Sequence, residues 1–255
     1  MKLNRTAQRT VEILKLASES PDGIALDEIC KALQMPKTSA YDIVTTLHHM
    51  GMLHMEKGPK QKYTVGLSAY RIGVSYTNHM DMKETIEPEL KKLAAEAGKT
   101  VFFGILADNE IVYISKAEPE NPIITTATVG TKNPVYCTSL GKAILAECDK
   151  KMQISVLSQV RFEQRTSRTI LRQERFLEEL ETARKRGYAF DDRELEEHMK
   201  CVGSAVYGKD GKVVGAISVS GLYRPDEDYD ALGRMVKRRA KEVSALLGYL
   251  GKNTD

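Results

Sequence analysis

The chain has 255 residues, of which 42% are hydrophobic, with 38 basic and 35 acidic side chains and no Trp. This composition is that of an ordinary globular protein, and the length fits one or two domains of roughly 100–200 residues each. No apolar run approaches the roughly 18 residues of a membrane helix and no apolar signal core follows the first residues, so we expect a cytoplasmic protein without a membrane partner. The four Cys are scattered without a Cys-x-x-Cys pair, which predicts neither a disulfide framework nor a zinc module.

The net charge of +3 is concentrated in the first third of the chain. Residues 1–80 contain ten basic and seven acidic side chains, whereas the remaining residues contain 28 of each. This asymmetry indicates an N-terminal module that binds a polyanion, attached to an electrically neutral body.

The N-terminal pattern predicts three short helices and a hairpin. Apolar spacing predicts a helix over residues 6–18, a turn at residues 20–23, and a second helix with Asp27 as its capping residue. Pro36 interrupts that helix and starts a third one, which ends at Gly51. A strand over residues 52–56, a basic turn with glycine and proline, and a strand over residues 63–66 follow. This order of elements is typical of a winged helix-turn-helix.

The rest of the chain mixes helices with antiparallel strands. Asp108-Asn109-Glu110 and Asp210-Gly211 each separate two apolar runs, as expected of hairpin turns. The predicted helices cover residues 67–76, 82–97, 140–148, 172–186 and 231–250, and the predicted strands residues 101–107, 111–117, 206–209 and 212–220. The fold class predicted for the second half is therefore α+β.

Three segments of the second half carry a family likeness. They are Pro134-Val135-Tyr136-Cys137-Thr138-Ser139-Leu140-Gly141-Lys142-Ala143-Ile144-Leu145-Ala146, then Gly187-Tyr188-Ala189-Phe190-Asp191-Asp192-Arg193-Glu194 leading to Cys201, and Gly215-Ala216-Ile217-Ser218-Val219-Ser220-Gly221. Together with the basic winged helix-turn-helix they resemble the IclR family of bacterial transcriptional regulators over nearly the whole chain. The resemblance implies a DNA-binding domain at residues 1–66, a linker helix at 67–81 and an effector-binding domain at 82–255, related to GAF and PAS sensors and built on an antiparallel sheet. It also implies control of a catabolic operon.

The third helix is the candidate for insertion into the major groove, where its first turns present polar side chains to the bases. We expect Lys37 and Tyr41 to contact bases and Thr38 and Ser39 to contact mainly phosphates. Further phosphate contacts are expected from Arg9 on the first helix and from the wing lysines Lys57, Lys60 and Lys62. A solvated polar helix face is the alternative interpretation, and the basic hairpin that follows favours DNA.

Asp42 departs from the family pattern, in which Arg is common at this place. A carboxylate repels phosphate, accepts from cytosine N4, or pairs with a lysine of the protein, and the sequence leaves these alternatives open.

Similarity to relatives that bind small keto acids implies an effector pocket formed by Gly130, Thr131, Asp191, Cys201, Ser218 and Ser220. Ser218 and Ser220 are two apart on a strand and therefore face the same side. Gly130 lets backbone N–H groups approach a carboxylate, and Thr138 or Ser139 caps a helix whose N-terminus attracts anions. Each position also has a purely structural interpretation. Ser218 and Ser220 would pack under a helix without binding a ligand, Cys201 would be a small buried hydrophobic side chain, and Asp191 would cap a helix or stabilise a turn.

Other functional classes compete with ligand-controlled DNA binding. Cys137 before a helix would suit an activated thiolate, and His198 with Cys201 resembles half of a metal or nucleophile–base pair. His198 is the only His beyond residue 80, however, and no catalytic triad or phosphate loop accompanies it. We therefore expect neither an enzyme nor a cofactor, and keep a redox- or metal-sensing regulator as the alternative.

One winged module makes too few contacts for high specificity, so a homodimer reading two half-sites is expected. The family implies dimers through the N-terminal domains and often tetramers through the sensor domains. The sign of the effector response, the effector and the operator are not determined by the sequence.

Overall fold

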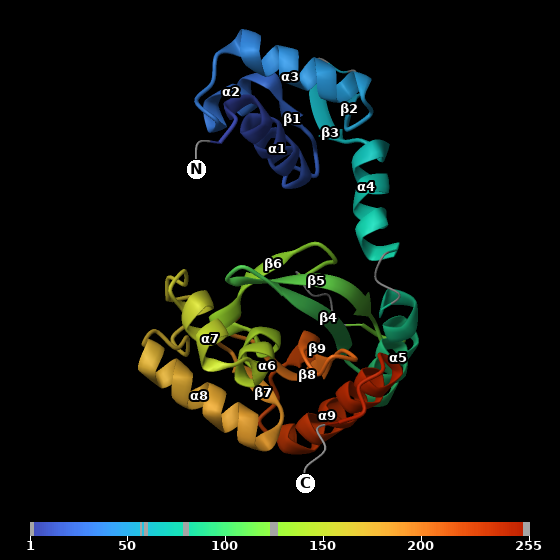
Figure 1. Ribbon diagram of the computed structural model, residues 1–255, viewed down its shortest axis with the longest axis vertical. Helices are drawn as coiled ribbons and strands as arrows, with labels where there is room; N and C mark the ends of the chain where they lie inside the picture. Colours follow the sequence, from blue (N-terminus) through green and yellow to red (C-terminus); the bar gives the residue numbers. More distant parts are fainter. Residues whose placement is uncertain (1–2, 57, 59–60, 79–81, 123–126, 252–255) are drawn as a thin grey trace. The chain divides into compact units, whose positions relative to one another are not determined.

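The computed structural model describes residues 3–56, 58, 61–78, 82–122 and 127–251. The chain divides into two compact units, Met1–Asp81 and Met82–Asp255, and each is considered by itself (Figure 1).

The first unit packs helices against a small antiparallel sheet with strand order β1-β3-β2. Its elements are α1 (Arg5–Ser18), β1 (Ile24–Ala25), α2 (Leu26–Ala32), α3 (Lys37–His49), β2 (Leu53–Glu56), β3 (Lys62–Val65) and α4 (Leu67–Asn78). Ile13, Ile29, Val44 and Tyr63 meet in one buried cluster, so α1, α2 and α3 each contribute one apolar face to the core. The predicted winged helix-turn-helix is confirmed, and β1 is a third strand that the sequence pattern did not reveal.

The second unit contains a six-stranded antiparallel sheet of order β6-β5-β4-β9-β8-β7. Its elements are α5 (Met82–Ala97), β4 (Thr100–Ala107), β5 (Glu110–Ala117), β6 (Lys132–Pro134), a 3-10 turn (Val135–Cys137), α6 (Ser139–Glu147), α7 (Lys150–Leu157), α8 (Gln173–Arg186), β7 (Ala189–Asp192), β8 (Met199–Tyr207), β9 (Val213–Leu222) and α9 (Tyr229–Leu246). The predicted α+β class is confirmed.

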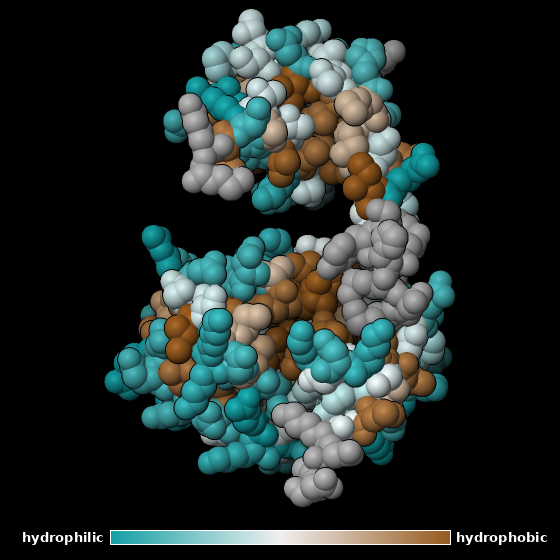
Figure 2. Space-filling view, in the orientation of Figure 1, coloured by the Kyte–Doolittle hydropathy of each residue, from teal (hydrophilic) through white to brown (hydrophobic). Residues whose placement is uncertain are grey.

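Helices cover both faces of this sheet. Because strand side chains alternate, Phe102 and Ala216 enter a core under α6 and α8, whereas Phe103 and Ile217 enter a second core under α5 and α9. Helices α5 and α9 lie side by side (Figure 1). In Figure 2, hydrophilic side chains dominate the visible face over α8, and apolar side chains gather over β4 and β5.

Several predictions about elements need correction. Helix α9 ends at Leu246, short of the predicted residue 250, and β8 covers Met199–Tyr207, where a strand over residues 206–209 was expected. The sequence patterns did not predict α7 or the short strands β6 and β7. Asp27 does not cap α2: the N-cap is Ala25, whose N–H donates to Glu28 Oε2 at 2.7 Å. The Glu28 carboxylate, at the third helical position, thus reaches back to the backbone N–H of the N-cap, which is one half of a capping box.

Candidate DNA-binding surface and effector pocket

Helix α3 separates an apolar face from a polar one at its first turns. Ala40, Val44 and Leu47 are buried in the core of the first unit, whereas Lys37 and Thr38 are exposed, and Ser39 is half-buried. Tyr41 is 53% exposed, and an aromatic side chain this exposed is unusual unless a binding partner covers it. The start of α3 thus presents a cation, hydroxyl groups and an aromatic ring to a ligand outside the domain.

Lys37 is held in place by the helix that precedes α3. Its Nζ lies 2.8 Å from Oδ1 of Asp27, and both side chains are about two-thirds exposed. The hydrogen bond and the negative charge of Asp27 raise the pKa of Lys37, so the ammonium stays charged. Because solvent screens an exposed pair of this kind, exchanging Asp27 for a ligand costs little.

The wing, which is the β2–β3 hairpin, is anchored through Lys62. In the register of the β2–β3 hairpin Lys62 faces Glu56, and its Nζ donates to the backbone carbonyl of Asp22 at 3.1 Å, in the turn after α1. One of its three ammonium donors is thus engaged. Lys57 and Lys60 lie outside the described residues, and Arg9 is half-buried on α1.

In the second unit the sheet brings three of the predicted pocket residues into one row. Asp191 on β7 pairs with Cys201 on β8, and Cys201 pairs with Ser220 on β9, so their side chains share the face under α6 and α8. All three line one cavity of ≈ 40 Å³. Its other walls are Phe102, Tyr113, Ala127, Asn133, Leu195, Glu196 and Met199.

Burial in this pocket changes the acidity of Asp191. Its side chain is buried, and burial raises its pKa to about 7 against the opposing effect of the N–H groups of Glu194 and Leu195 and of the Lys142 charge. Oδ1 accepts from the N–H of Glu194 at 2.8 Å. The pocket therefore holds a carboxyl group that exchanges its proton near neutral pH.

An aromatic wall stands opposite Asp191. The rings of Phe102 and Tyr113 meet edge to face with centroids 4.8 Å apart, and the Tyr113 hydroxyl accepts from Nδ2 of Asn133 at 3.2 Å. Sequence reasoning missed these residues, because Phe102 and Tyr113 reach the pocket only through the register of β4 and β5. The alternation of apolar residues along β5 was the signal available for Tyr113.

The other predicted pocket residues do not line this cavity. Gly130 has φ +89° in an exposed turn, and its N–H donates to the carbonyl of Tyr113, while the N–H of Thr131 donates to the carbonyl of Thr128. These two amides are engaged within the chain, and their approach to a ligand stays a prediction. Ser218 is buried on the same face as Ser220, opposite Phe102 and Gly203 in the sheet.

The expected anion site at the start of α6 is also closed. Thr138 is the cap, with Oγ1 accepting from the N–H of Gly141 at 3.2 Å, but a Cβ placed on Gly203 would come within 2.7 Å of the Ser139 carbonyl oxygen. Strand β8 therefore packs directly against the helix terminus and leaves no room for a ligand between them.

Lys142 supplies a buried charge beside the pocket. It forms an ion pair with Glu194, and both side chains are at most 7% exposed. Oε2 of Glu194 is buried without a hydrogen-bond partner among the described residues. No sequence motif pointed to this pair, because its members are 52 residues apart.

The cysteines do not have the character of nucleophiles. All four are free thiols, and burial raises the pKa of Cys137 to about 12 and raises that of Cys201 as well. The sulfur atoms of Cys137 and Cys201 are therefore protonated at neutral pH. Within the described ranges there is no cluster of three or more His, Cys, Asp or Glu side chains arranged to bind a metal ion, nor a helix long and apolar enough to span a membrane.

Known proteins share both units. The model of the IclR helix-turn-helix domain matches residues 6–56, and that of the bacterial transcriptional regulator IclR C-terminal domain matches residues 74–245. The acetate operon repressor of Salmonella typhimurium is 28% identical over 244 residues, covering 94% of this chain and 89% of the repressor.

Solved structures agree with these matches. The crystal structure of Thermotoga maritima IclR has a TM-score of 0.76 and 29% identity, over 96% of this chain and 99% of that one. An IclR homologue from Microbacterium hydrocarbonoxydans, complexed with 4-hydroxybenzoate, shares the fold with a TM-score of 0.83 at 16% identity, over 95% and 98% of the two chains. Members of this family are transcription regulators, so the interpretation of Cys137 as an enzymatic nucleophile is wrong. The chain belongs to the IclR family of bacterial transcriptional regulators.

Proposed function

We propose that this regulator binds an operator of a catabolic operon as a homodimer, and that a small carboxylate or aromatic effector bound beside Asp191 controls the binding. Residues 1–66 would read DNA, 67–81 would link, and 82–255 would bind the effector. We place the protein in the bacterial cytoplasm, and on the nucleoid when it is bound to DNA. The observation that carries the proposal is the cavity lined by Asp191, Cys201 and Ser220 on three neighbouring strands. The chain that forms this cavity belongs to a family whose members regulate transcription.

On the operator, Lys37 and Tyr41 contact base edges, and Thr38 and Ser39 contact phosphates. Arg9 and the wing lysines Lys57, Lys60 and Lys62 add further phosphate contacts. The exposure of Lys37 and Tyr41 supports this assignment, since neither side chain has to leave the core to reach a groove. Lys37 exchanges an exposed carboxylate partner for a base or phosphate, which conserves its charge pairing.

Mobility shifts at several salt concentrations test these roles, on a duplex that the purified protein selects from random sequences. Lys37→Ala and Tyr41→Ala should each lose about 1–3 kcal/mol of discrimination between selected and random DNA. Lys60→Ala should weaken both equally and flatten the salt dependence. Lys15→Ala, at the exposed C-terminal end of α1, is the matched control. Equal losses on both duplexes for Lys37→Ala would remove Lys37 from the base-reading residues.

Dimerisation is supported by the exposed apolar side chains of α4. Leu67 is 72% and Tyr70 67% exposed, a degree of exposure that favours burial in an interface. Replacing Leu67 with Asp and Tyr70 with Ser should lower the sedimentation coefficient and abolish cooperative binding to two half-sites. An unchanged mass of the doubly substituted protein would place the interface elsewhere. Tetramers formed through the second units should appear as a further, heavier species at higher protein concentration.

The effector assignment rests on the chemistry of the pocket. The aromatic wall of Phe102 and Tyr113 suits a planar ring, and the homologue from Microbacterium hydrocarbonoxydans is complexed with 4-hydroxybenzoate. Ser218, Ser220, Cys201, Gly130 and Thr131 are the proposed neighbours of the ligand, with Asp191 accepting a hydroxyl or sharing its proton with a carboxylate. A cavity of ≈ 40 Å³ holds little more than a water molecule, so effector binding requires the lining side chains to move apart.

A thermal-shift screen against organic, sugar and aromatic acids would identify the effector class, since a ligand of the native state raises its apparent stability. The double variant Ser218→Ala/Ser220→Ala should abolish the shift and the effector response while retaining DNA affinity. Ser158→Ala, at the exposed end of α7, is the control. If the double variant responded at the same effector concentration as the wild type, this pocket would not be the effector site.

A further inference from the structure

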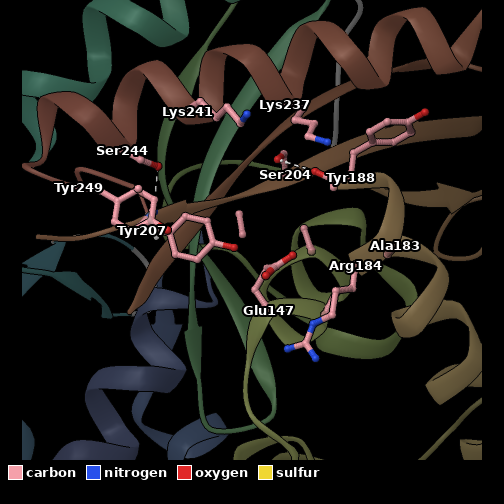
Figure 3. A pocket seen from close by; sticks show the side chains of 15 residues that line it. Glu147, Ala183, Arg184, Tyr188, Ser204, Tyr207, Lys237, Lys241, Ser244 and Tyr249 are labelled. Atoms are coloured by element: carbon pink, nitrogen blue, oxygen red, sulfur yellow. Dashed lines mark hydrogen bonds between the residues drawn. The ribbon is translucent and has the colours of Figure 1, made fainter. Parts of the chain in front are cut away.

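A second and larger cavity lies at the free part of strand β8. Strand β7 pairs with β8 only from Lys200 to Gly203, so Ser204–Tyr207 continues without that neighbour. Here α6 and α8 approach from one face of the sheet and α9 from the other, and they enclose ≈ 410 Å³ (Figure 3). This volume lies in the range of roughly 300–1,000 Å³ that is typical of small-molecule sites.

Cations outnumber acids on its walls. Lys237 and Lys241 project from α9 on one side, and Arg184 and Glu147 project from the opposite side (Figure 3). Glu147 is engaged by the hydroxyl of Tyr207. Arg184 donates to the carbonyl of Cys148 at 3.0 Å.

The two lysines differ from the other cations of α9. Arg234, Arg238 and Arg239 each pair with carboxylates, whereas Lys237 and Lys241 have no carboxylate partner among the described residues. Lys237 donates to the carbonyl of Arg186 at 2.9 Å, which leaves two of its ammonium donors, and no partner within the described ranges engages Lys241. Residues four apart on a helix are neighbours, and two like charges in this relation repel each other. An anion placed between them removes this repulsion.

The remaining walls suit an apolar body. Small side chains of Ala143, Ala146 and Ala205 form part of the lining, and the rings of Tyr207 and Tyr249 stack with centroids 4.8 Å apart. This arrangement accommodates a flat hydrocarbon group beside a pair of ammonium groups.

We propose that this cavity is a second ligand site, separate from the pocket at Asp191, for a compact organic anion with a carboxylate or phosphate group and an apolar body. The anionic group binds between Lys237 and Lys241, and the body packs against the alanines and Tyr207. The ligand touches the C-terminal half of α6, whose N-terminal half carries Lys142 beside the effector pocket.

Isothermal titration of the full-length protein with benzoate, phenyl phosphate and inorganic phosphate tests the proposal. Phenyl phosphate or benzoate should bind, inorganic phosphate should bind more weakly, and Lys241→Gln should weaken binding about tenfold. Lys241 is exposed and makes no side-chain hydrogen bond or ion pair among the described residues, so its replacement should leave the fold intact. Lys212→Gln, at an exposed turn, is the matched control and should bind as the wild type does.

Lysine acetylation read by mass spectrometry locates the bound probe. Saturating phenyl phosphate should protect Lys237 and Lys241 but not Lys212, and it should do so equally in the Ser218→Ala/Ser220→Ala variant. Absence of heat with all three probes up to about 10 mM would overturn the proposal. Binding that persists in Lys241→Gln and protects Lys37 instead, or binding lost with the two serines, would overturn it as well.

Discussion

Lys142 and Glu194 form an ion pair in a place where neither side chain reaches solvent. The pair joins α6 to the segment after β7, and the backbone of the same Glu194 donates to Asp191 and accepts from the hydroxyl of Thr169 at 2.8 Å. The geometry of the Asp191 carboxyl group therefore depends on a charge that comes from a different part of the chain.

Lys142→Met should destabilise the protein strongly, because it leaves the Glu194 carboxylate buried without its partner. Removing one member of a buried pair costs about 3–5 kcal/mol, whereas replacing both members by apolar groups is often neutral. Urea unfolding should therefore show a large decrease in the free energy of unfolding for Lys142→Met, and a partial recovery of that free energy for Lys142→Met/Glu194→Leu. Lys212→Met breaks an exposed pair and should change the free energy of unfolding by less than about 0.5 kcal/mol. A small effect of Lys142→Met would show that water reaches Glu194.

Asp191 should make stability depend on pH in the direction opposite to that of most carboxylates. Its pKa is about 7 in the folded chain and about 3.9 when unfolded, so the folded state binds the proton more tightly. The stabilisation is fully present below pH 4 and is lost as pH rises through 7. Between pH 5 and 8 the free energy of unfolding of the wild type should fall by about 2–3 kcal/mol relative to that of Asp191→Asn. Unfolding at several pH values measures this difference, with Asp210→Asn as the exposed control; parallel pH profiles of wild type and Asp191→Asn would contradict it.

Local patterns predicted the winged helix-turn-helix because its elements are short, close in sequence and separated by Pro36 and Gly51. The pocket was predicted only in part. Asp191, Cys201 and Ser220 came from motif resemblance. Phe102 and Tyr113 join them through the pairing of five strands, and the register of this pairing cannot be deduced from any one segment of the sequence. The occupied amides of Gly130 and Thr131 likewise depend on Tyr113 and Thr128.

Gly141→Ala should destabilise the second unit by about 1–3 kcal/mol or more, because overpacking forces the neighbouring backbone apart. A Cβ at this position would come within 2.1 Å of the Val135 carbonyl oxygen. Gly73→Ala is the control: apart from the backbone of α4 itself, no atom of the described residues lies within 4 Å of the added Cβ, and α4 should gain about 0.5–1 kcal/mol of helix propensity. Thermal unfolding of both variants tests the contrast. A neutral Gly141→Ala would mean that α6 shifts away from the 3-10 turn at no cost.

Asp42→Arg should strengthen DNA binding. Asp42 is exposed on α3, and its carboxylate forms no ion pair with any residue that the structure describes. Its charge therefore opposes the approach of phosphate, and the substitution changes the charge of each α3 by two units. We expect about tenfold tighter binding to random duplexes at low salt and a steeper salt dependence, by about 0.9 in the logarithmic slope for each added phosphate contact. Glu181→Arg on α8 makes the same change of charge in the second unit and should leave both quantities nearly unchanged. The contrary result would be a loss of affinity for the selected operator alone, matched by the same loss when the wild type binds an operator with a cytosine replaced. The Asp42 carboxylate would then accept a hydrogen bond from cytosine N4. In that case Asp42 would belong with Lys37 and Tyr41 among the base-reading residues.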